Sequence, residues 1–256
     1  MKKNVNVKLL NYWEVVAGSF RISQQISTVL FFIGFYLQLR SNDFHFNWIW
    51  VGLVLSFIMY LIYVFITASY DNAVSTFKNG ILFAIVLIFM TPITRNLTKA
   101  IATDSIWALT TLMLLANLLF HDYESDVATH TRFPDSLSIN AAMFASTLLA
   151  SRLDSNYKVS LLMLQAVMLF ALFPIFRRSV RVSFPSPILD GLMSFVITIA
   201  TLYIFKDIST LTCGIHILLT LTVNFLCPYL FTIIQMYKNE IRGPWDEAII
   251  GKSLEE

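Results

Sequence analysis

The polar segment HDYESDVATHTRFPD, residues 121–135, holds the densest group of side chains capable of chemistry. Asp122 and Asp126 are four residues apart, so a helix would place both carboxylates on one face. Such a pair can hold Mg²⁺ together with the phosphates of a substrate. Membrane enzymes that transfer prenyl or phosphatidyl groups usually show denser paired-carboxylate motifs, and this sequence has none. We therefore interpret the segment as a solvated polar loop and assign it no metal and no catalytic residue.

Ionisable side chains are sparse within the apolar runs of the sequence. His216 is the clearest case, and Asn117, Asn140, Gln165 and Asn224 add uncharged polar groups. Ionisable groups inside a membrane mark function by default, but polar side chains there also form interhelical hydrogen bonds. A proton or ion pathway would need a chain of carboxylates, which these residues do not supply. We favour the hydrogen-bonding interpretation.

Nucleotide-binding motifs are missing from the sequence. The eight glycines form neither GxGxxG nor a P-loop, and no polar stretch is long enough for a nucleotide-binding α/β domain. Another chain must therefore bind any nucleotide-activated donor, and no cofactor is expected here.

The formal net charge is only +2 without a basic cluster, so nucleic acid is not an expected partner. Cys213 and Cys227 would lie about 21 Å apart along a helix, too far for a disulfide.

The elements that position these side chains are apolar runs of membrane-spanning length. Charged residues make up only 13% of the chain, whereas a soluble domain usually carries about a quarter. Apolar runs occupy residues 22–39, 47–69, 81–93, 105–120, 136–151, 159–176, 188–205 and 211–236. Most approach the roughly 17–25 residues that cross a bilayer, and the first lacks a signal-peptide cleavage pattern. The sequence predicts an all-α polytopic membrane bundle of about eight transmembrane helices, forming one integral membrane domain over residues 1–256.

Lysines and arginines in the connections predict the orientation of these spans. Twelve of them fall on one side of the membrane and six on the other. The richer side holds both ends of the chain, so both termini are predicted to be cytosolic. The connection 95–103 is predicted to be lumenal.

The fifth apolar run carries a stripe of small residues. Ser138, Ala142, Ser146 and Ala150 recur every four residues. Small residues at this spacing let neighbouring helices approach closely, so we expect this packing face to be buried against protein. Leu148 lies two residues from Ser146 and is expected on the opposite side.

Prolines lie within or near the ends of three runs. Pro92 and Pro174 are near run ends, whereas Pro228 lies well inside the last run. Because proline removes a backbone donor and kinks a helix, we expect the last helix to bend or break near Cys227-Pro228.

Four long blocks of this sequence resemble a known family. They are YWEVVAGSFRISQQIS from Tyr12, TPITRNLTKAIATDSIWALTTLMLLANLLFHDY from Thr91, SLSINAAMFASTLLASRL from Ser136, and CPYLFTIIQMYKNEIRGPWDEA from Cys227. From Tyr12 to about Glu247, the chain resembles the C subunits of the phosphatidylinositol N-acetylglucosaminyltransferase complex.

The resemblance implies a role in the first step of glycosylphosphatidylinositol (GPI) anchor biosynthesis. That complex transfers N-acetylglucosamine from its UDP-sugar to phosphatidylinositol on the cytoplasmic face of the endoplasmic reticulum. A separate glycosyltransferase subunit with two Rossmann-like domains binds the UDP-sugar and does the chemistry. The resemblance therefore implies a non-catalytic, multi-pass subunit of the endoplasmic reticulum membrane. Its implied partners are the catalytic glycosyltransferase subunit, other membrane subunits of the complex, and phosphatidylinositol.

Polar residues on the predicted cytosolic side are candidate contacts for a partner subunit or a lipid headgroup. They are Arg21, Gln24, Gln25, His121, Asp122, Tyr123, Arg177, Arg178, Arg181, Arg242, Trp245 and Asp246. Arginines there can bind inositol phosphate or anchor the chain to anionic lipids, and the sequence leaves both open. Two other functions are kept as alternatives: a lipid transporter or scramblase, which predicts inverted repeats and broken helices, and a stand-alone membrane transferase that uses the Asp122 segment.

Overall fold

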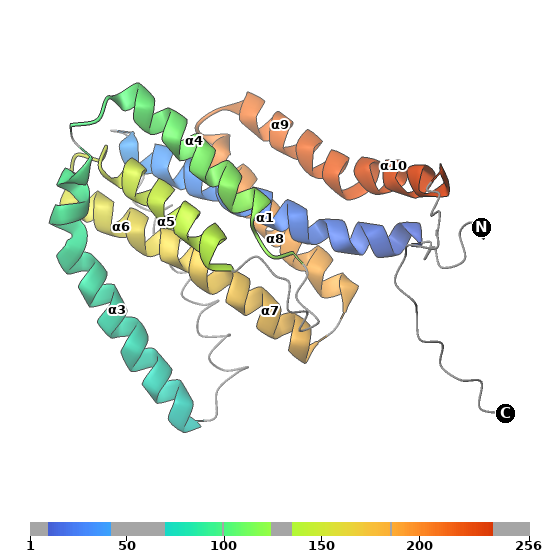
Figure 1. Cartoon of the computed structure of the whole chain (residues 1–256), viewed down its shortest axis with the longest axis horizontal. Coiled ribbons are helices and arrows are strands. Elements are labelled where there is room, and N and C mark those ends of the chain that lie inside the picture. The colour runs from blue at the N-terminus through green and yellow to red at the C-terminus, as the bar shows by residue number, and fades with distance from the viewer. Residues whose placement is uncertain (1–9, 42–69, 99, 124–134, 185, 238–256) are drawn as a thin grey trace, which may run out of the picture.

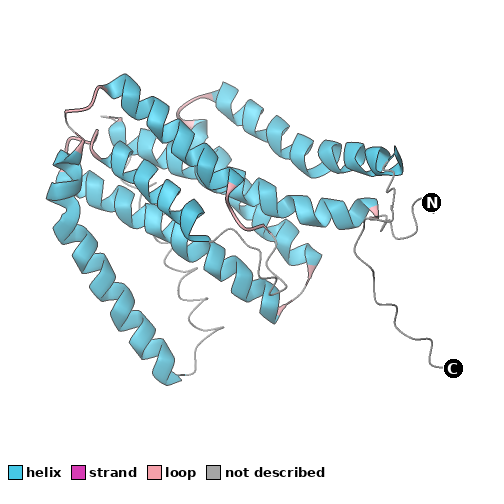
Figure 2. Cartoon of the chain, viewed as in Figure 1, coloured by secondary structure: helices cyan, strands magenta, loops and turns pink. Residues whose placement is uncertain are grey.

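The computed structural model describes residues 10–41, 70–98, 100–123, 135–184 and 186–237. Within these ranges the chain forms helices joined by short connections, and no strand occurs there (Figure 2). The predicted all-α class is confirmed. The α-helices are α1 (Tyr12–Arg40), α3 (Tyr70–Leu97), α4 (Thr103–Leu119), α5 (Asp135–Ala150), α6 (Asn156–Val167), α7 (Phe173–Ser183), α8 (Pro187–Lys206), α9 (Thr210–Leu221) and α10 (Cys227–Ile234).

Several described helices are long and apolar enough to cross a membrane, as the sequence predicts. These are Tyr12–Arg40, Gly80–Leu97, Asn156–Ser183, Pro187–Lys206 and Thr210–Ile234, whereas α4 and α5 are apolar but shorter. Helices suit these sequences because a segment surrounded by lipid must satisfy its backbone hydrogen bonds internally. The predicted run 47–69 lies outside the described residues. The count of about eight spans, the cytosolic termini and the single domain remain predictions.

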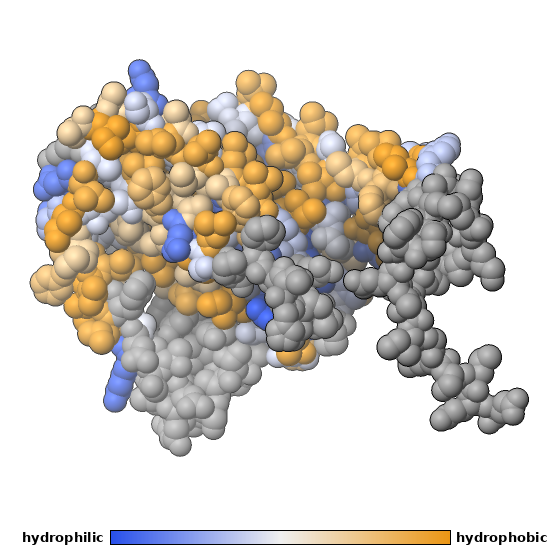
Figure 3. Space-filling model, viewed as in Figure 1, coloured by the Kyte–Doolittle hydropathy of each residue, from blue (hydrophilic) through white to orange (hydrophobic). Residues whose placement is uncertain are grey.

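Apolar side chains cover much of the visible surface (Figure 3). Leu112 and Leu119 of α4 and Leu211, Ile215 and Leu218 of α9 are all more than half exposed. A soluble monomer rarely exposes such a large apolar surface. Contact with lipid removes the cost of exposing apolar side chains to water, so this surface is consistent with helices that lie in a membrane.

Helix α1 lies at the centre of the bundle (Figure 1) and packs against α8, α6, α4 and α10. Phe32 packs edge-on against Phe170, with ring centroids 5.1 Å apart. Gly34 permits the close approach of α8, because a methyl group there would lie 2.6 Å from Ile204 Cγ2. The N-terminal half of α1 instead buries polar side chains, and this half positions the site described below.

Helix α5 is buried on more than one face. Ser138, Ala142, Ser146 and Ala150 are each 0–1% exposed, and α5 packs against α4, α6 and α3. Leu148, expected on the side opposite Ser146, is also buried, because its side chain is only 1% exposed. The reason is that α5 lies among several helices instead of resting on one.

Each proline in the two interrupted helices follows a wide helical turn. A π-helical turn at Met168–Leu172 precedes Pro174, and another at Thr222–Leu226 precedes Pro228. Proline cannot donate a backbone hydrogen bond, and a π turn is one way in which a helix accommodates such a defect. The expected break near Cys227-Pro228 therefore takes the form of a π turn, and α10 continues the helix beyond it.

Candidate functional site

A buried arginine lies at the centre of a polar cluster near one end of the bundle. Arg177 of α7 is 4% exposed. Its Nη1 donates to Gln24 Oε1 at 3.2 Å, and its Nη2 donates to Gln25 Oε1 at 2.9 Å. Nη2 also lies 3.0 Å from His121 Nε2. The guanidinium Cζ is 4.8 Å from the centre of the Phe173 ring. None of these contacts is made with a negatively charged group.

The contact with Arg177 determines the protonation state of His121. An arginine can only donate hydrogen bonds, so His121 Nε2 accepts and the proton of the neutral ring is on Nδ1. Burial, followed by the positive charges of Arg177 and Arg181, lowers the pKa of His121 to about 3. His121 is therefore neutral at physiological pH.

Tyr123 also lacks the properties of an acid or base working near neutral pH. Burial raises its pKa to about 12, and its hydroxyl donates to the Leu118 carbonyl at 2.6 Å. Its ring packs edge-on against His121 with centroids 5.0 Å apart. The side chains of His121 and Tyr123 therefore contribute to the packing of the cluster.

Asp190, at the start of α8, forms ion pairs with Arg21 and Arg181. Its carboxylate lies 3.6 Å from Arg21 Nε and 3.5 Å from Arg181 Nε. Its backbone carbonyl accepts a hydrogen bond from Gln24 Nε2 at 2.8 Å, and Arg21 Nη1 donates to the Tyr123 carbonyl at 3.2 Å. The cluster thus connects α1, α7, α8 and the segment that follows α4.

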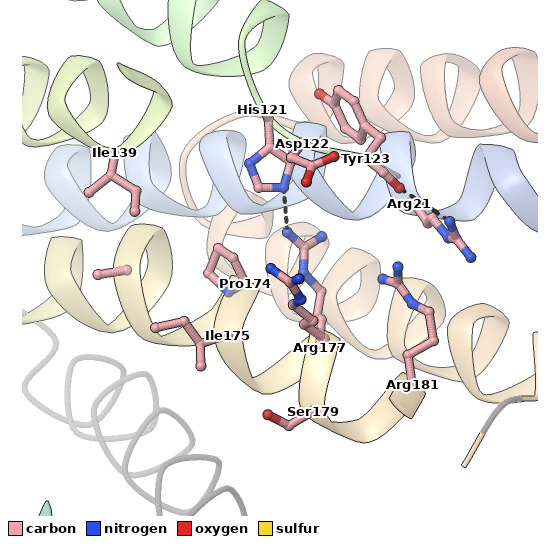
Figure 4. A pocket seen from close by; sticks show the side chains of 12 residues that line it. Arg21, His121, Asp122, Tyr123, Ile139, Pro174, Ile175, Arg177, Ser179 and Arg181 are labelled. Carbon is pink, nitrogen blue, oxygen red and sulfur yellow. Dashed lines mark hydrogen bonds between the residues drawn. The ribbon is translucent and has the colours of Figure 1, made fainter. Parts of the chain in front are cut away.

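A pocket of about 210 Å³ opens beside this cluster (Figure 4). It is lined by Arg21, His121, Asp122, Tyr123, Ile139, Ala171, Pro174, Ile175, Arg177, Arg178, Ser179 and Arg181. Four arginines therefore face a single carboxylate, Asp122, among the lining side chains. Figure 4 shows Ile139, Pro174 and Ile175 towards one end of the pocket and Arg21 and Arg181 towards the other.

Nine of the twelve candidate contact residues predicted from the sequence lie in or beside this cluster. Gln24 and Gln25 lie behind Arg177 and do not line the pocket, whereas the other seven do. Arg242, Trp245 and Asp246 lie outside the described residues, as does Asp126. Among the described residues, no group of three or more His, Cys, Asp or Glu side chains is placed to hold a metal.

Sequence reasoning missed Asp190 but singled out Asn117. Asp190 is a lone carboxylate at the start of an apolar run, a signal that marks functional or paired residues in membrane helices. Asn117 accepts a hydrogen bond from Gln25 Nε2 at 3.0 Å and donates to Ser138 Oγ at 2.8 Å. This agrees with the predicted interhelical bonding for Asn117. His216 is 1% exposed, and its ring nitrogens have no hydrogen-bond partner among the described residues.

Comparison with known proteins connects this arrangement to a family. A family model described as phosphatidylinositol N-acetylglucosaminyltransferase, GPI2, matches residues 1–246. The GPI2 subunit of phosphatidylinositol N-acetylglucosaminyltransferase from Schizosaccharomyces pombe is 33% identical over 259 residues, covering 97% of this chain and 79% of the relative. No solved structure matches the chain.

Two further relatives are named as C subunits of the same transferase. The putative Dictyostelium discoideum protein is 38% identical over 252 residues, covering 97% of this chain and 72% of the relative. The Homo sapiens protein is 28% identical over 261 residues, covering 99% of this chain and 86% of the relative. The similarity therefore extends over nearly the full length of the chain.

Proposed function

This chain belongs to the phosphatidylinositol N-acetylglucosaminyltransferase (GPI2) family, and we propose that it is the non-catalytic membrane scaffold of the complex that transfers N-acetylglucosamine from UDP-N-acetylglucosamine to phosphatidylinositol. In this role it holds the catalytic glycosyltransferase subunit and the other membrane subunits at the cytosolic face of the endoplasmic reticulum membrane. It also helps to place the phosphatidylinositol headgroup. The reaction begins GPI-anchor biosynthesis.

The observation that carries this proposal is the hydrogen-bonded cluster around Arg177. Side chains from α1, α7 and the segment after α4 meet there, and Asp190 ties in the start of α8. A cluster that fixes four segments relative to one another gives a rigid polar end to an otherwise apolar bundle. A partner needs such a preorganised surface, because ordering mobile side chains on binding costs free energy.

The properties of the cluster also support a division of labour. Its histidine and tyrosine have pKa values far from neutrality, whereas a general acid or base works best with a pKa near the operating pH. The pocket volume of about 210 Å³ is below the roughly 300–1,000 Å³ of sites for drug-sized ligands. A nucleotide sugar therefore fits a partner's site better than this one.

The two alternative functions differ in what they require. A stand-alone transferase would use Asp122, which lines the pocket, together with Asp126. A transporter would be expected to have discontinuous helices at mid-membrane, whereas the helix from Thr210 to Ile234 continues through its π turn.

Replacement of both carboxylates tests the scaffold against the enzyme. The Asp122→Asn, Asp126→Asn double variant is expressed with the other subunits, and recovery of the complex and its turnover are both measured. In a scaffold, turnover per assembled complex at saturating phosphatidylinositol stays at the wild-type value. Loss of turnover with full assembly would move catalysis into this chain. Asp154→Asn combined with Asp207→Asn, both near the opposite end of the bundle, is the matched control.

A further inference from the structure

We propose that the pocket beside Arg177 binds the phosphate of an anionic phospholipid whose headgroup carries hydroxyl groups. The proposed function is used only to identify this headgroup as that of phosphatidylinositol. The binding site itself is inferred from charge, burial and shape. The chain would then present the lipid acceptor, while another subunit supplies the sugar donor.

The buried charge of Arg177 favours an anion in the pocket. Its described polar partners, Gln24, Gln25 and His121, are all uncharged, and its Nε has no hydrogen-bond partner among the described residues. Burying a charge is costly unless it is paired. Asp190, the nearby buried carboxylate, is already shared between Arg21 and Arg181. An anion in the pocket would therefore supply the missing counter-charge.

The type of side chain indicates which anion fits. Arginine presents a planar fork of N–H donors that matches the oxygens of a phosphate, and four arginines line this pocket. Because His121 Nε2 accepts from Arg177, its Nδ1 remains a donor. Ser179 adds a hydroxyl oxygen among the lining residues, and hydroxyl groups of a headgroup can donate to it.

The pocket has both charged and apolar lining residues, which favours a lipid over a free anion. Its lining combines the arginines with the apolar residues Ile139, Ala171, Pro174 and Ile175 (Figure 4). The last three precede Arg177 in the helix Asn156–Ser183 and so lie farther from its C-terminal end. Arg177, Arg178 and Arg181 belong to the last turns of that helix, where a spanning segment reaches the level of the lipid phosphates. A ligand with a charged head and an apolar tail matches this order.

Lipid retention by the full chain tests the proposal. The chain is reconstituted in nanodiscs that contain equal amounts of phosphatidylinositol, phosphatidylserine and phosphatidylcholine. It is then released into detergent, and the lipids that stay bound are counted by native mass spectrometry. Wild-type chain should retain phosphatidylinositol in preference to the other two lipids. Arg178→Gln should lower this retention about tenfold, the effect of losing one hydrogen bond to a charged group.

Variants and competitors separate the possible outcomes. Arg178 is exposed, so its replacement spares the fold, and Arg177→Lys is the more stringent second variant because lysine keeps the charge without the planar fork. Arg40→Gln removes the same charge from the far end of α1 and should retain lipid as wild type does. Soluble glycerophosphoinositol should displace the lipid, whereas inorganic phosphate should not.

Three results would overturn the proposal. They are wild-type retention in both Arg178→Gln and Arg177→Lys, equal retention of phosphatidylserine, and displacement by inorganic phosphate as effective as that by glycerophosphoinositol. Co-purification with the glycosyltransferase subunit is measured in parallel. A chain that binds the lipid without assembling would contradict the proposed function and support the lipid site. A chain that assembles without retaining the lipid would contradict the lipid site and support the proposed function.

Discussion

Arg177 donates to Gln25 Oε1 at 2.9 Å across a sequence separation of 152 residues. Gln25 in turn donates to Asn117 Oδ1 at 3.0 Å, and Asn117 donates to the Ser138 hydroxyl at 2.8 Å. This chain of hydrogen bonds runs from the pocket through α7, α1 and α4 to α5. It ties the orientation of the buried guanidinium to the packing of the bundle interior.

The centre of this chain is Asn117, and its removal should destabilise the protein. Asn117→Leu removes the acceptor of Gln25 Nε2 and the donor to Ser138, whereas the Ser138 hydroxyl still donates to the backbone carbonyl of residue 117. Losing such hydrogen bonds between membrane helices costs about 0.6–2 kcal/mol. We expect a lower Tm in detergent, measured by tryptophan fluorescence. Asn140→Leu, at an exposed position of α5, is the control and should leave Tm unchanged. Equal Tm values for the two variants would show that the hydrogen-bonded chain contributes no stability.

The small residues of α5 give a second prediction. Ala142 is 0% exposed, so a larger side chain there must push neighbouring helices apart. Ala142→Leu should cost about 1–3 kcal/mol through overpacking and lower the recovery of the assembled complex. Phe144 is 47% exposed on the same helix, and Phe144→Leu should recover normally. If both variants are recovered equally, the packing face does not limit assembly.

Protonation of His121 predicts how stability depends on pH. The pKa of His121 is lowered to about 3 in the folded chain, whereas an unfolded histidine titrates near pH 6.5. The unfolded state therefore binds the proton first as pH falls. The stability associated with the neutral ring is fully present above about pH 6.5 and is lost as pH falls towards 3.

The measurement is Tm as a function of pH for wild type and His121→Asn. The wild-type Tm should fall more steeply between about pH 6.5 and 4 than that of the variant, which has no imidazole to protonate. Parallel curves would mean that the His121 ring titrates alike in the folded and unfolded chains.

The ends of α8 test the predicted orientation. In a variant without Cys213 and Cys227, single cysteines are introduced by Ser183→Cys, before α8, and by Asp207→Cys, after it; both positions are exposed. An impermeant thiol reagent should modify the first from the cytosolic side and the second only after the lumen is opened. The reverse pattern would invert the predicted topology.

Much of the fold follows from the sequence because hydrophobic length and lipid thickness restrict where helices begin and end. The run 188–205 differs from α8, Pro187–Lys206, by only one residue at each end. The position of the prolines predicted a disturbance near Pro228, but not its form. A missing backbone donor can be accommodated by a kink, a break or a π turn, and tertiary packing decides among them.

The candidate site was only partly predictable, for a different reason. Arg177, Arg178 and Arg181 look alike in the sequence, yet Arg177 is buried and Arg178 is exposed. That distinction depends on the rotation of α7 and on acceptors in α1 that lie far away in sequence. Leu148 illustrates the same limit, because one small-residue stripe predicts one buried face, whereas α5 has neighbours on several sides.

This chain is expected to support transfer of the sugar without performing it. The most direct measurement is the formation of N-acetylglucosaminyl phosphatidylinositol from UDP-N-acetylglucosamine by the purified chain in liposomes that contain phosphatidylinositol. The chain alone should form no product, because sites for such donors normally need an α/β crevice with helix N-termini directed at the phosphates. Product should appear when the glycosyltransferase subunit is added. Robust transfer by the isolated chain would place catalysis in this subunit.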